Sequence, residues 1–171
     1  MTIEELLARE AVRDTIGRYV SATDRGRYGE LADVFMPDGI IMFGDRVRYE
    51  GRDAIIAGMT EGAKKRGAFD SDAKFQRHLL GDPIIRVVDD SHARAVTYIL
   101  VLSEDGVDAS GVYIDHFEKS GARWLIASRY ANMEWGRGDS RNARHFKPAP
   151  TPLDRFDLGF FNAAASVARD A

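Results

Sequence analysis

The sequence predicts a single α+β domain in which helices come first and long antiparallel strands follow. Apolar residues recur at helical spacing from Ile3 to Val20. Four β-rich segments then occupy residues 76–88, 92–103, 109–119 and 123–135, and short turn signals separate them. A chain of 171 residues with 44% hydrophobic content can bury one core of its own. Helices grouped ahead of a run of long strands are typical of the α+β class.

The first half of the chain carries recognisable start and stop signals. Thr2 followed by Glu5 is a capping-box pattern at the start of a helix. Pro37-Asp38-Gly39 is expected to stop a second helix and turn the chain, and Asp53 lies near the N-cap of a third. The elements expected here are helices at 3–24, 28–35 and 53–66 and strands at 40–43 and 48–50.

The end of the chain departs from this pattern. We expect the domain to span residues 1–136 and a tail to span 137–171. Lys147 to Pro152 is rich in proline and cannot enter the interior of a sheet. Leu153 to Ala168 is expected to form a short helix that packs on the domain, on a partner subunit or over a pocket mouth.

Composition argues against several classes of function. A net charge of −3 and a pI near 5.8 do not fit a nucleic-acid-binding face, which needs clustered Lys and Arg. No apolar run approaches the length of about 18 residues that a membrane span needs. The absence of cysteine excludes thiolate nucleophiles and cysteine metal ligands, and it suits a cytoplasmic protein. The spacing of Asp38, Asp45 and Asp53 does not fit a calcium loop, so no metal and no cofactor are predicted.

Asp24 and His78 are the first candidates for chemistry. Asp24 lies at the C-terminal end of the first helix, where the helix dipole disfavours a carboxylate. It is either a solvated turn residue or a buried carboxylate that orients a histidine. His78 lies early in the first long strand, where it is either structural or a base suited to proton transfer near neutral pH.

The last two strands supply a second pair. Alternation places Asp115 with Tyr113 on one face of the third long strand, and it turns His116 to the other face. On the last strand, Arg129 is expected to share a face with Leu125, Ala127, Ala131 and Met133, opposite Trp124 and Ile126. A buried Arg129 needs a carboxylate, and Asp115 is the candidate. The pair is either structural or places Arg129 to stabilise a departing anion.

Five stretches, taken together, resemble the SnoaL-like branch of the nuclear-transport-factor-2-like superfamily. They are "IGRYVSATDRGRYGELADVFMPDGII", "YEGRDAIIAGM", "FQRHLLGDPIIRV", "HARAVTYILVL" and "GVYIDHFEKSGARWLIASRYANMEW". The resemblance implies a cone-shaped α+β barrel, in which a strongly curved mixed sheet packs on three N-terminal helices around a deep apolar pocket. It is nearest to the scytalone dehydratase and lindane dehydrochlorinase group.

The resemblance also assigns roles to individual residues. It implies that Asp24 and His78 form a catalytic dyad, that Arg129 is the dehydrochlorinase-type arginine, and that Tyr113 lies in the pocket. Thr23 stands where scytalone dehydratase has a tyrosine, so a tyrosine-bound water cannot be carried over whole. Further residues are expected to bind the substrate, namely Tyr19 and Tyr28, which are candidates to replace that tyrosine, and Phe43, Tyr98, Asp115 and Trp135.

These observations predict a cofactor-independent lyase, of the dehydratase, dehydrohalogenase or aldehyde-releasing type, acting on a small apolar, aromatic or cyclic molecule by Asp–His general acid–base catalysis. An isomerase or polyketide cyclase with the same pocket is the first alternative, and a non-catalytic small-molecule-binding protein is the second. The resemblance further implies a homo-oligomer, a dimer or a trimer.

Overall fold

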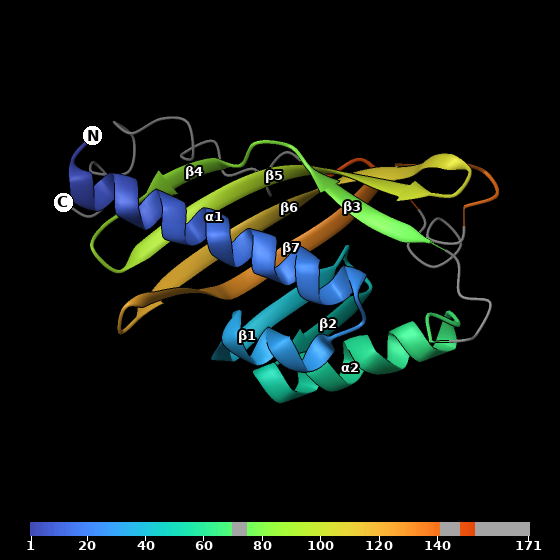
Figure 1. Cartoon of the computed structure of the whole chain (residues 1–171), viewed down its shortest axis with the longest axis horizontal. Helices are drawn as coiled ribbons and strands as arrows, with labels where there is room; N and C mark the ends of the chain where they lie inside the picture. Colours follow the sequence, from blue (N-terminus) through green and yellow to red (C-terminus); the bar gives the residue numbers. More distant parts are fainter. Residues whose placement is uncertain (70–74, 141–147, 153–171) are drawn as a thin grey trace.

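The computed structural model describes residues 1–69, 75–140 and 148–152 (Figure 1). Its elements follow in chain order: α1 (Ile3–Asp24), the 3-10 helix η1 (Tyr28–Asp33), β1 (Phe35–Phe43), β2 (Val47–Glu50), α2 (Arg52–Lys65), β3 (Gln76–Leu80), β4 (Ile84–Val87), β5 (His92–Ser103), β6 (Gly106–Ser120) and β7 (Arg123–Gly136). None of the helices in these residues is long and apolar enough to cross a membrane.

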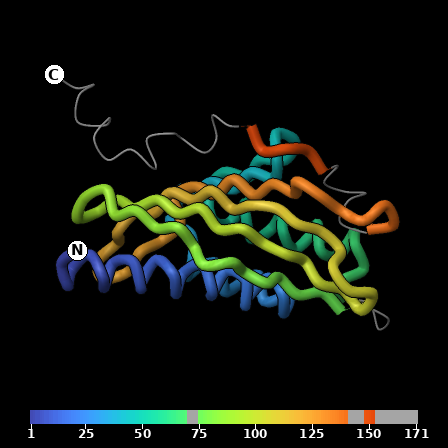
Figure 2. The backbone as a smooth tube through the Cα atoms, turned by 90° about the horizontal axis from the view of Figure 1, so that it is seen from above, coloured from blue at the N-terminus to red at the C-terminus, as the bar shows by residue number. Residues whose placement is uncertain are grey.

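One mixed sheet joins all the strands in the order β2-β1-β7-β6-β5-β3, and β4 also pairs with β5. Only β1 and β7 pair in parallel, while the other described pairs are antiparallel. The helix α1 runs along one face of the long strands (Figures 1 and 2). The predicted α+β fold, a mixed sheet packed on three helices, is confirmed. The sheet is open and does not close into a complete barrel.

The first helix follows directly from its sequence. The side chain of Thr2 caps it by accepting a hydrogen bond from the backbone N of Glu5 at 3.2 Å. Val12, Ile16 and Tyr19 lie on its buried stripe and join the main core against the sheet. The helix therefore lies fixed along the sheet, and its last residue, Asp24, is carried to a defined place beside β3.

The strand β1 begins five residues earlier than predicted. Phe35 already pairs with Ile126 of β7, and the register shifts between Phe35 and Ile40. Pro37-Asp38-Gly39 therefore forms an irregular segment within β1 and does not mark the end of a helix. Gly39 is needed there because a Cβ atom would lie 2.9 Å from the backbone carbonyl oxygen of Met36 and 3.1 Å from that of Ile126. The preceding helix, η1, ends at Asp33.

The predicted segment 76–88 is two strands, β3 and β4, and both pair with β5. The chain breaks at Gly81-Asp82-Pro83, because proline has no N–H for the ladder and restricts the residue before it. The backbone N of Gly81 still donates to the carbonyl oxygen of Tyr98 at 2.8 Å, so the break remains attached to β5.

The predicted faces of β7 are wrong at its N-terminal half. His116 pairs with Ser128 and Phe117 pairs with Ile126, so Ala127 is an extra residue in β7. This bulge reverses the alternation, and it brings Trp124 and Ile126 into the core on the same face as Arg129. Strict alternation had placed Leu125 and Ala127 there instead.

Part of the predicted tail lies along β7. The side-chain nitrogen of Asn132 donates to the carbonyl oxygen of Ala149 at 2.8 Å and to the hydroxyl of Thr151 at 2.9 Å. The strand itself ends at Gly136, the last residue of the predicted domain. The helix expected at 153–168 lies outside the described residues, so it and the division into domain and tail stay predictions.

Asp115 of β6 and Arg129 of β7 form the expected ion pair at the centre of the inner face. The two residues lie directly opposite each other in the sheet, and both are 0% exposed. Arg129 donates from Nε to Oδ1 and from Nη2 to Oδ2 of Asp115, each at 2.7 Å. Burial alone lowers the pKa of Arg129, but the carboxylate of Asp115 outweighs it and raises that pKa above its usual value. Arg129 therefore remains charged.

Replacing one member of this pair should cost far more stability than replacing both. We expect Arg129→Met to lower the free energy of unfolding by about 3–5 kcal/mol, because it leaves a buried carboxylate without its partner. The double variant Asp115→Leu/Arg129→Met should recover most of that loss. Urea denaturation followed by circular dichroism measures both values.

Arg123 provides the matched control for this experiment. It pairs with Asp33 at 2.9 Å, but both side chains are largely exposed, so Arg123→Met should change stability little. A loss for Arg129→Met no larger than that for Arg123→Met would contradict a structural role for the buried pair.

Candidate active site

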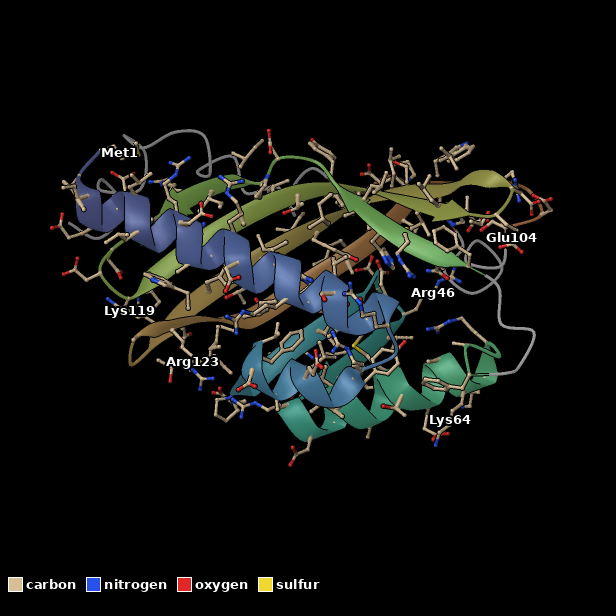
Figure 3. All side chains as sticks on the ribbon, in the orientation of Figure 1. Met1, Arg46, Lys64, Glu104, Lys119 and Arg123 are labelled. Atoms are coloured by element: carbon tan, nitrogen blue, oxygen red, sulfur yellow. The ribbon has the colours of Figure 1, made fainter. Side chains whose placement is uncertain are left out.

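A cavity of about 840 Å³ opens at the end of the sheet where α1 stops. Its lining comes from the C-terminal ends of α1 and α2, the turn between β1 and β2, the strand β3 and the inner faces of β6 and β7. Figure 3 labels two of the lining residues, Arg46 and Glu104, in this part of the molecule. Six of the predicted site residues line the cavity: Tyr19, Asp24, Tyr28, Phe43, His78 and Tyr113.

Asp24 and His78 are in direct contact at the wall of this cavity. The Nδ1 atom of His78 lies 2.6 Å from Oδ1 of Asp24, and the backbone N of His78 donates to Oδ2 at 3.1 Å. The side chain of His78 is only 15% exposed and that of Asp24 only 7%. Among the described residues nothing bonds Nε2 of His78. An ionised Asp24 favours the tautomer with the proton on Nδ1, which leaves the lone pair of Nε2 available.

The position of Asp24 at a helix terminus has a local compensation. No basic residue occupies the last turn of α1, but Arg25, its C-cap residue, donates from Nη1 to the backbone carbonyl oxygen of Ser21 at 3.3 Å. Arg77, which precedes His78 on β3, donates from Nη1 to the backbone carbonyl oxygen of Asp24 at 3.3 Å. The strand β3 thus supplies both a partner for the carboxylate and a cation for the end of the helix.

Two tyrosines connect the cavity to the buried ion pair. The guanidinium carbon of Arg129 lies 4.0 Å from the ring centroid of Tyr19 and 4.2 Å from that of Tyr113. The two rings meet edge to face with centroids 5.7 Å apart. Within the described residues Nη1 of Arg129 has no hydrogen-bond partner, and the cation lies against the negative faces of the two rings instead.

Both tyrosine hydroxyls stay protonated at neutral pH. Burial raises the pKa of Tyr19 to about 12, although the nearby Arg129 lowers it in part. Burial likewise raises the pKa of Tyr113 well above its usual value, and the charges of Tyr19, Asp115 and Asp24 act in the same direction, against Arg129. The pKa of Tyr28 is also raised, mainly by burial. Neutral phenols at the cavity wall can donate hydrogen bonds but are poor bases.

Four of the predicted site residues do not reach the cavity. Arg129 and Asp115 are completely buried beneath Tyr19 and Tyr113, so they contact the cavity lining and not the cavity. Tyr98 and Trp135 are 54% and 51% exposed and do not line the cavity. The register places Tyr98 opposite Val112, away from the core that Tyr113 joins.

Several aromatic and apolar lining residues were not singled out from the sequence. They are Tyr49, Met59, Phe69, Phe75 and Met133. Tyr49 lies on a strand of four residues, which is too short to show alternation. Its ring packs on the backbone of α2 at Gly58, where a side chain would collide with it. Only Met133, on the face predicted to hold Arg129, carried a usable signal.

Metal-ligating side chains do not gather at this site. In the described part of the chain, no group of three or more His, Cys, Asp or Glu residues could hold a metal ion. The chemistry that these residues can perform is proton transfer by His78, hydrogen bonding by neutral tyrosines and attraction by exposed arginines.

Solved structures with the same fold include proteins described as enzymes. The structure superposes on a putative scytalone dehydratase from Novosphingobium aromaticivorans with a TM-score of 0.68, at 19% identity over 80% of this chain and 91% of that chain. It superposes on hexachlorocyclohexane dehydrochlorinase LinA-type3 from Novosphingobium barchaimii with a TM-score of 0.67, at 16% identity over 79% of this chain and 92% of that chain. At such identities these likenesses establish the fold alone.

A closer sequence match is a protein from Catenulispora acidiphila, solved in complex with S-DNPA. It is 29% identical over 72% of this chain and 91% of that chain, with a TM-score of 0.61. No curated protein matches the sequence significantly. The family model of the SnoaL-like domain matches residues 4–130, which include every strand but the end of β7. The chain therefore belongs to the SnoaL-like domain family.

Proposed function

We propose that this protein is a cofactor-independent lyase in which His78, oriented by Asp24, removes a proton from a small cyclic or aromatic molecule. The contact of 2.6 Å between Nδ1 of His78 and Oδ1 of Asp24, at the wall of a large cavity, is the observation that carries this proposal. A base held in one tautomer by a buried carboxylate is the arrangement that general base catalysis requires.

The reaction that this geometry favours is an elimination. Nε2 of His78 takes a proton from carbon, the electrons of the C–H bond form a double bond, and the leaving group departs from the neighbouring carbon with its own electron pair. Asp24 stabilises the imidazolium that forms. The products are an unsaturated molecule and either a hydroxide, which takes the proton from His78 and leaves as water, or a halide, in which case His78 returns its proton to solvent. If the proton returns at another carbon instead, the same pair performs an isomerisation. An aldehyde is released if Nε2 instead takes the proton of a hydroxyl group: the O–H electrons form the C=O bond, the adjacent C–C bond breaks, and the departing carbanion takes the proton from His78.

Tyr113 and Tyr19 are placed to assist the leaving group. Both line the cavity and both remain neutral, so each can donate a hydrogen bond to an oxygen or halogen that gains negative charge. Arg129 cannot reach that atom, because it is completely buried. We assign it a positioning role, in which its contact with both rings fixes the two hydroxyl groups.

Removing the base should abolish the activity. In a screen of cyclic halides, alcohols and hydroxy ketones, with products identified by mass spectrometry, we expect His78→Ala to lower kcat/KM by about 10²–10⁴-fold on any substrate found. Asp24→Asn should also lower kcat/KM, because an amide nitrogen cannot accept either of the two hydrogen bonds that the carboxylate takes from His78, and an amide N–H directed at Nδ1 favours the tautomer with the proton on Nε2.

The surface of the protein offers a control of the same chemistry. His92 and Asp89 form a second histidine–aspartate pair with an Nδ1–Oδ1 distance of 2.9 Å, but both are about half exposed and lie outside the cavity. His92→Ala should leave kcat/KM unchanged. Activity of His78→Ala within threefold of the native protein would exclude the lyase and isomerase, and unchanged ligand affinity would then indicate a binding protein.

The hydroxyl of Tyr113 should be needed for turnover more than for binding. We expect Tyr113→Phe to lower kcat by about 10-fold or more with little change in KM, because the hydrogen bond strengthens as charge develops. Tyr98→Phe is the matched control, since Tyr98 is exposed and lies outside the cavity. Equal kcat values for the two variants would remove Tyr113 from the mechanism.

The neutral state of Tyr19 can be tested through stability at high pH. Its pKa is about 12 in the folded protein and about 10 in an unfolded chain. The unfolded state therefore loses its proton first, and the stabilisation that is complete below pH 10 declines as the pH rises toward 12. By pH 11 the native protein should have lost about 1 kcal/mol more stability than Tyr19→Phe.

Urea titrations at several pH values between 8 and 11 measure this difference, each relative to the same variant at the lowest pH. Tyr98→Phe should follow the native protein over the whole range, because it removes an exposed hydroxyl. Parallel curves for the native protein and Tyr19→Phe would show that the Tyr19 hydroxyl is not held in its neutral form.

A further inference from the structure

One side of the cavity carries cations that the elimination mechanism does not use. Six Arg and Lys side chains line the cavity, and among the described residues five of them have no carboxylate partner. They are Arg25, Arg46, Lys65, Arg66 and Arg77. Arg25 comes from the end of α1, Arg46 from the turn between β1 and β2, Lys65 and Arg66 from the end of α2, and Arg77 from β3. Four separate segments of the chain therefore bring positive charge to one cavity.

The acidic side chains of the same lining are already engaged. Their contacts are Asp24 with His78, Glu61 with Lys64, Asp105 and Asp139 with Arg137, and Asp108 with Ser140, while Glu104 also has a partner. The formal charges of the lining therefore balance, with six carboxylates and six Arg and Lys side chains. What distinguishes the five cations is that each has no carboxylate partner among the described residues, so each is available to an anionic ligand.

Helix termini account for only part of this group. Lys65 and Arg66 lie at the C-terminal end of α2, and Arg25 lies at that of α1, where cations stabilise the helix dipole. Arg46 and Arg77 are not on a helix, and both are exposed at the rim of the cavity. Figure 3 shows Arg46 between β3 and the end of α2. Arg46 has no hydrogen-bond partner in the described part of the chain, so its donors are available to a ligand.

Arg77, which lies on β3, is held in place by contacts with its neighbours. Its guanidinium lies 5.0 Å from the ring centroid of Phe75 and donates to the backbone carbonyl oxygens of Asp24 and Gln76. It is also the residue next to the base His78. A guanidinium that is fixed by these contacts and still exposed is suited to bind a planar anion.

We propose that the substrate combines an aromatic or cyclic body with an anionic group, a carboxylate or a phosphate, and that Arg46 and Arg77 bind this group at the rim of the cavity. This inference rests on the proposed function and names its substrate class. The aromatic lining, including Tyr49 and Phe69, receives the ring. Anchoring the charged end at the rim fixes which carbon faces Nε2 of His78.

Matched probes test the charge preference directly. Calorimetric titration of the native protein with naphthalene-2-carboxylate and with its uncharged carboxamide compares the same ring with and without the charge. At low salt the carboxylate should bind about 10-fold more tightly, and about 0.5 M salt should remove most of that preference. Naphthalen-2-yl phosphate is a third probe: tighter binding than that of the carboxylate indicates a phosphate site, and weaker binding indicates a carboxylate site.

The variants Arg46→Gln and Arg77→Gln should each reduce the preference about threefold, and the double variant should abolish it. Arg48→Gln is the matched control. Arg48 is two residues from Arg46 on the same hairpin, but it pairs with Glu50 and does not line the cavity. It should keep the full preference. A preference that survives in the double variant, or falls equally in Arg48→Gln, would overturn the proposal.

The outcome is separable from that of the catalytic test. His78→Ala should retain the preference, because binding of the anion does not require the base. Equal affinities for the carboxylate and the carboxamide, or binding of neither, would overturn the anionic substrate and leave the base chemistry to be judged by kcat/KM. Full activity of His78→Ala together with a strong preference would instead overturn the lyase and retain an anion-binding cavity.

Discussion

The ion pair between Asp115 and Arg129 is the interaction around which the inner face of the sheet is arranged. A buried arginine requires a carboxylate in register, and this requirement ties β6 to β7 at one position. The same guanidinium supports the rings of Tyr19 and Tyr113 from below. Tyr19 belongs to α1, so the pair also fixes the helix on the sheet. The cavity wall therefore rests on a charged centre within an otherwise apolar core.

The contact between Asp24 and His78 depends on this packing, because α1 carries Asp24 and is itself held on the sheet through Tyr19. Asp24 and His78 are 54 residues apart and belong to a helix end and to β3, a strand at one end of the sheet. Their contact exists because α1 is anchored along its length and ends beside β3. The backbone N–H of His78 also contributes to the contact, since it donates to the second carboxylate oxygen. A solvated turn aspartate, the plainer interpretation of Asp24, is not what the fold produces.

The cavity differs in character from the apolar pocket that the family resemblance implied. Its inner wall is aromatic, with Tyr19 and Tyr113 above the buried pair, but its rim carries Arg46, Arg77 and other charged side chains. An apolar interior strengthens hydrogen bonds to developing charge, whereas an exposed cationic rim attracts and orients. The two regions suit one ligand with two chemically different ends, which is a narrower expectation than a small apolar molecule.

Sequence alone determined the elements whose signals are local. These signals act over a few residues: they are the cap at Thr2, the helical spacing from Ile3 to Val20 and the turns between the long strands. Which segments form helices and which form strands was therefore largely predictable. It also named Asp115 as the partner of Arg129, because residues on one face of neighbouring strands meet. Only the tertiary structure decided the bulge at Ala127 and the removal of Tyr98 from the cavity. It alone brought Asp24 to His78 and Arg46 to the rim, since contacts between distant segments follow from packing of the whole chain.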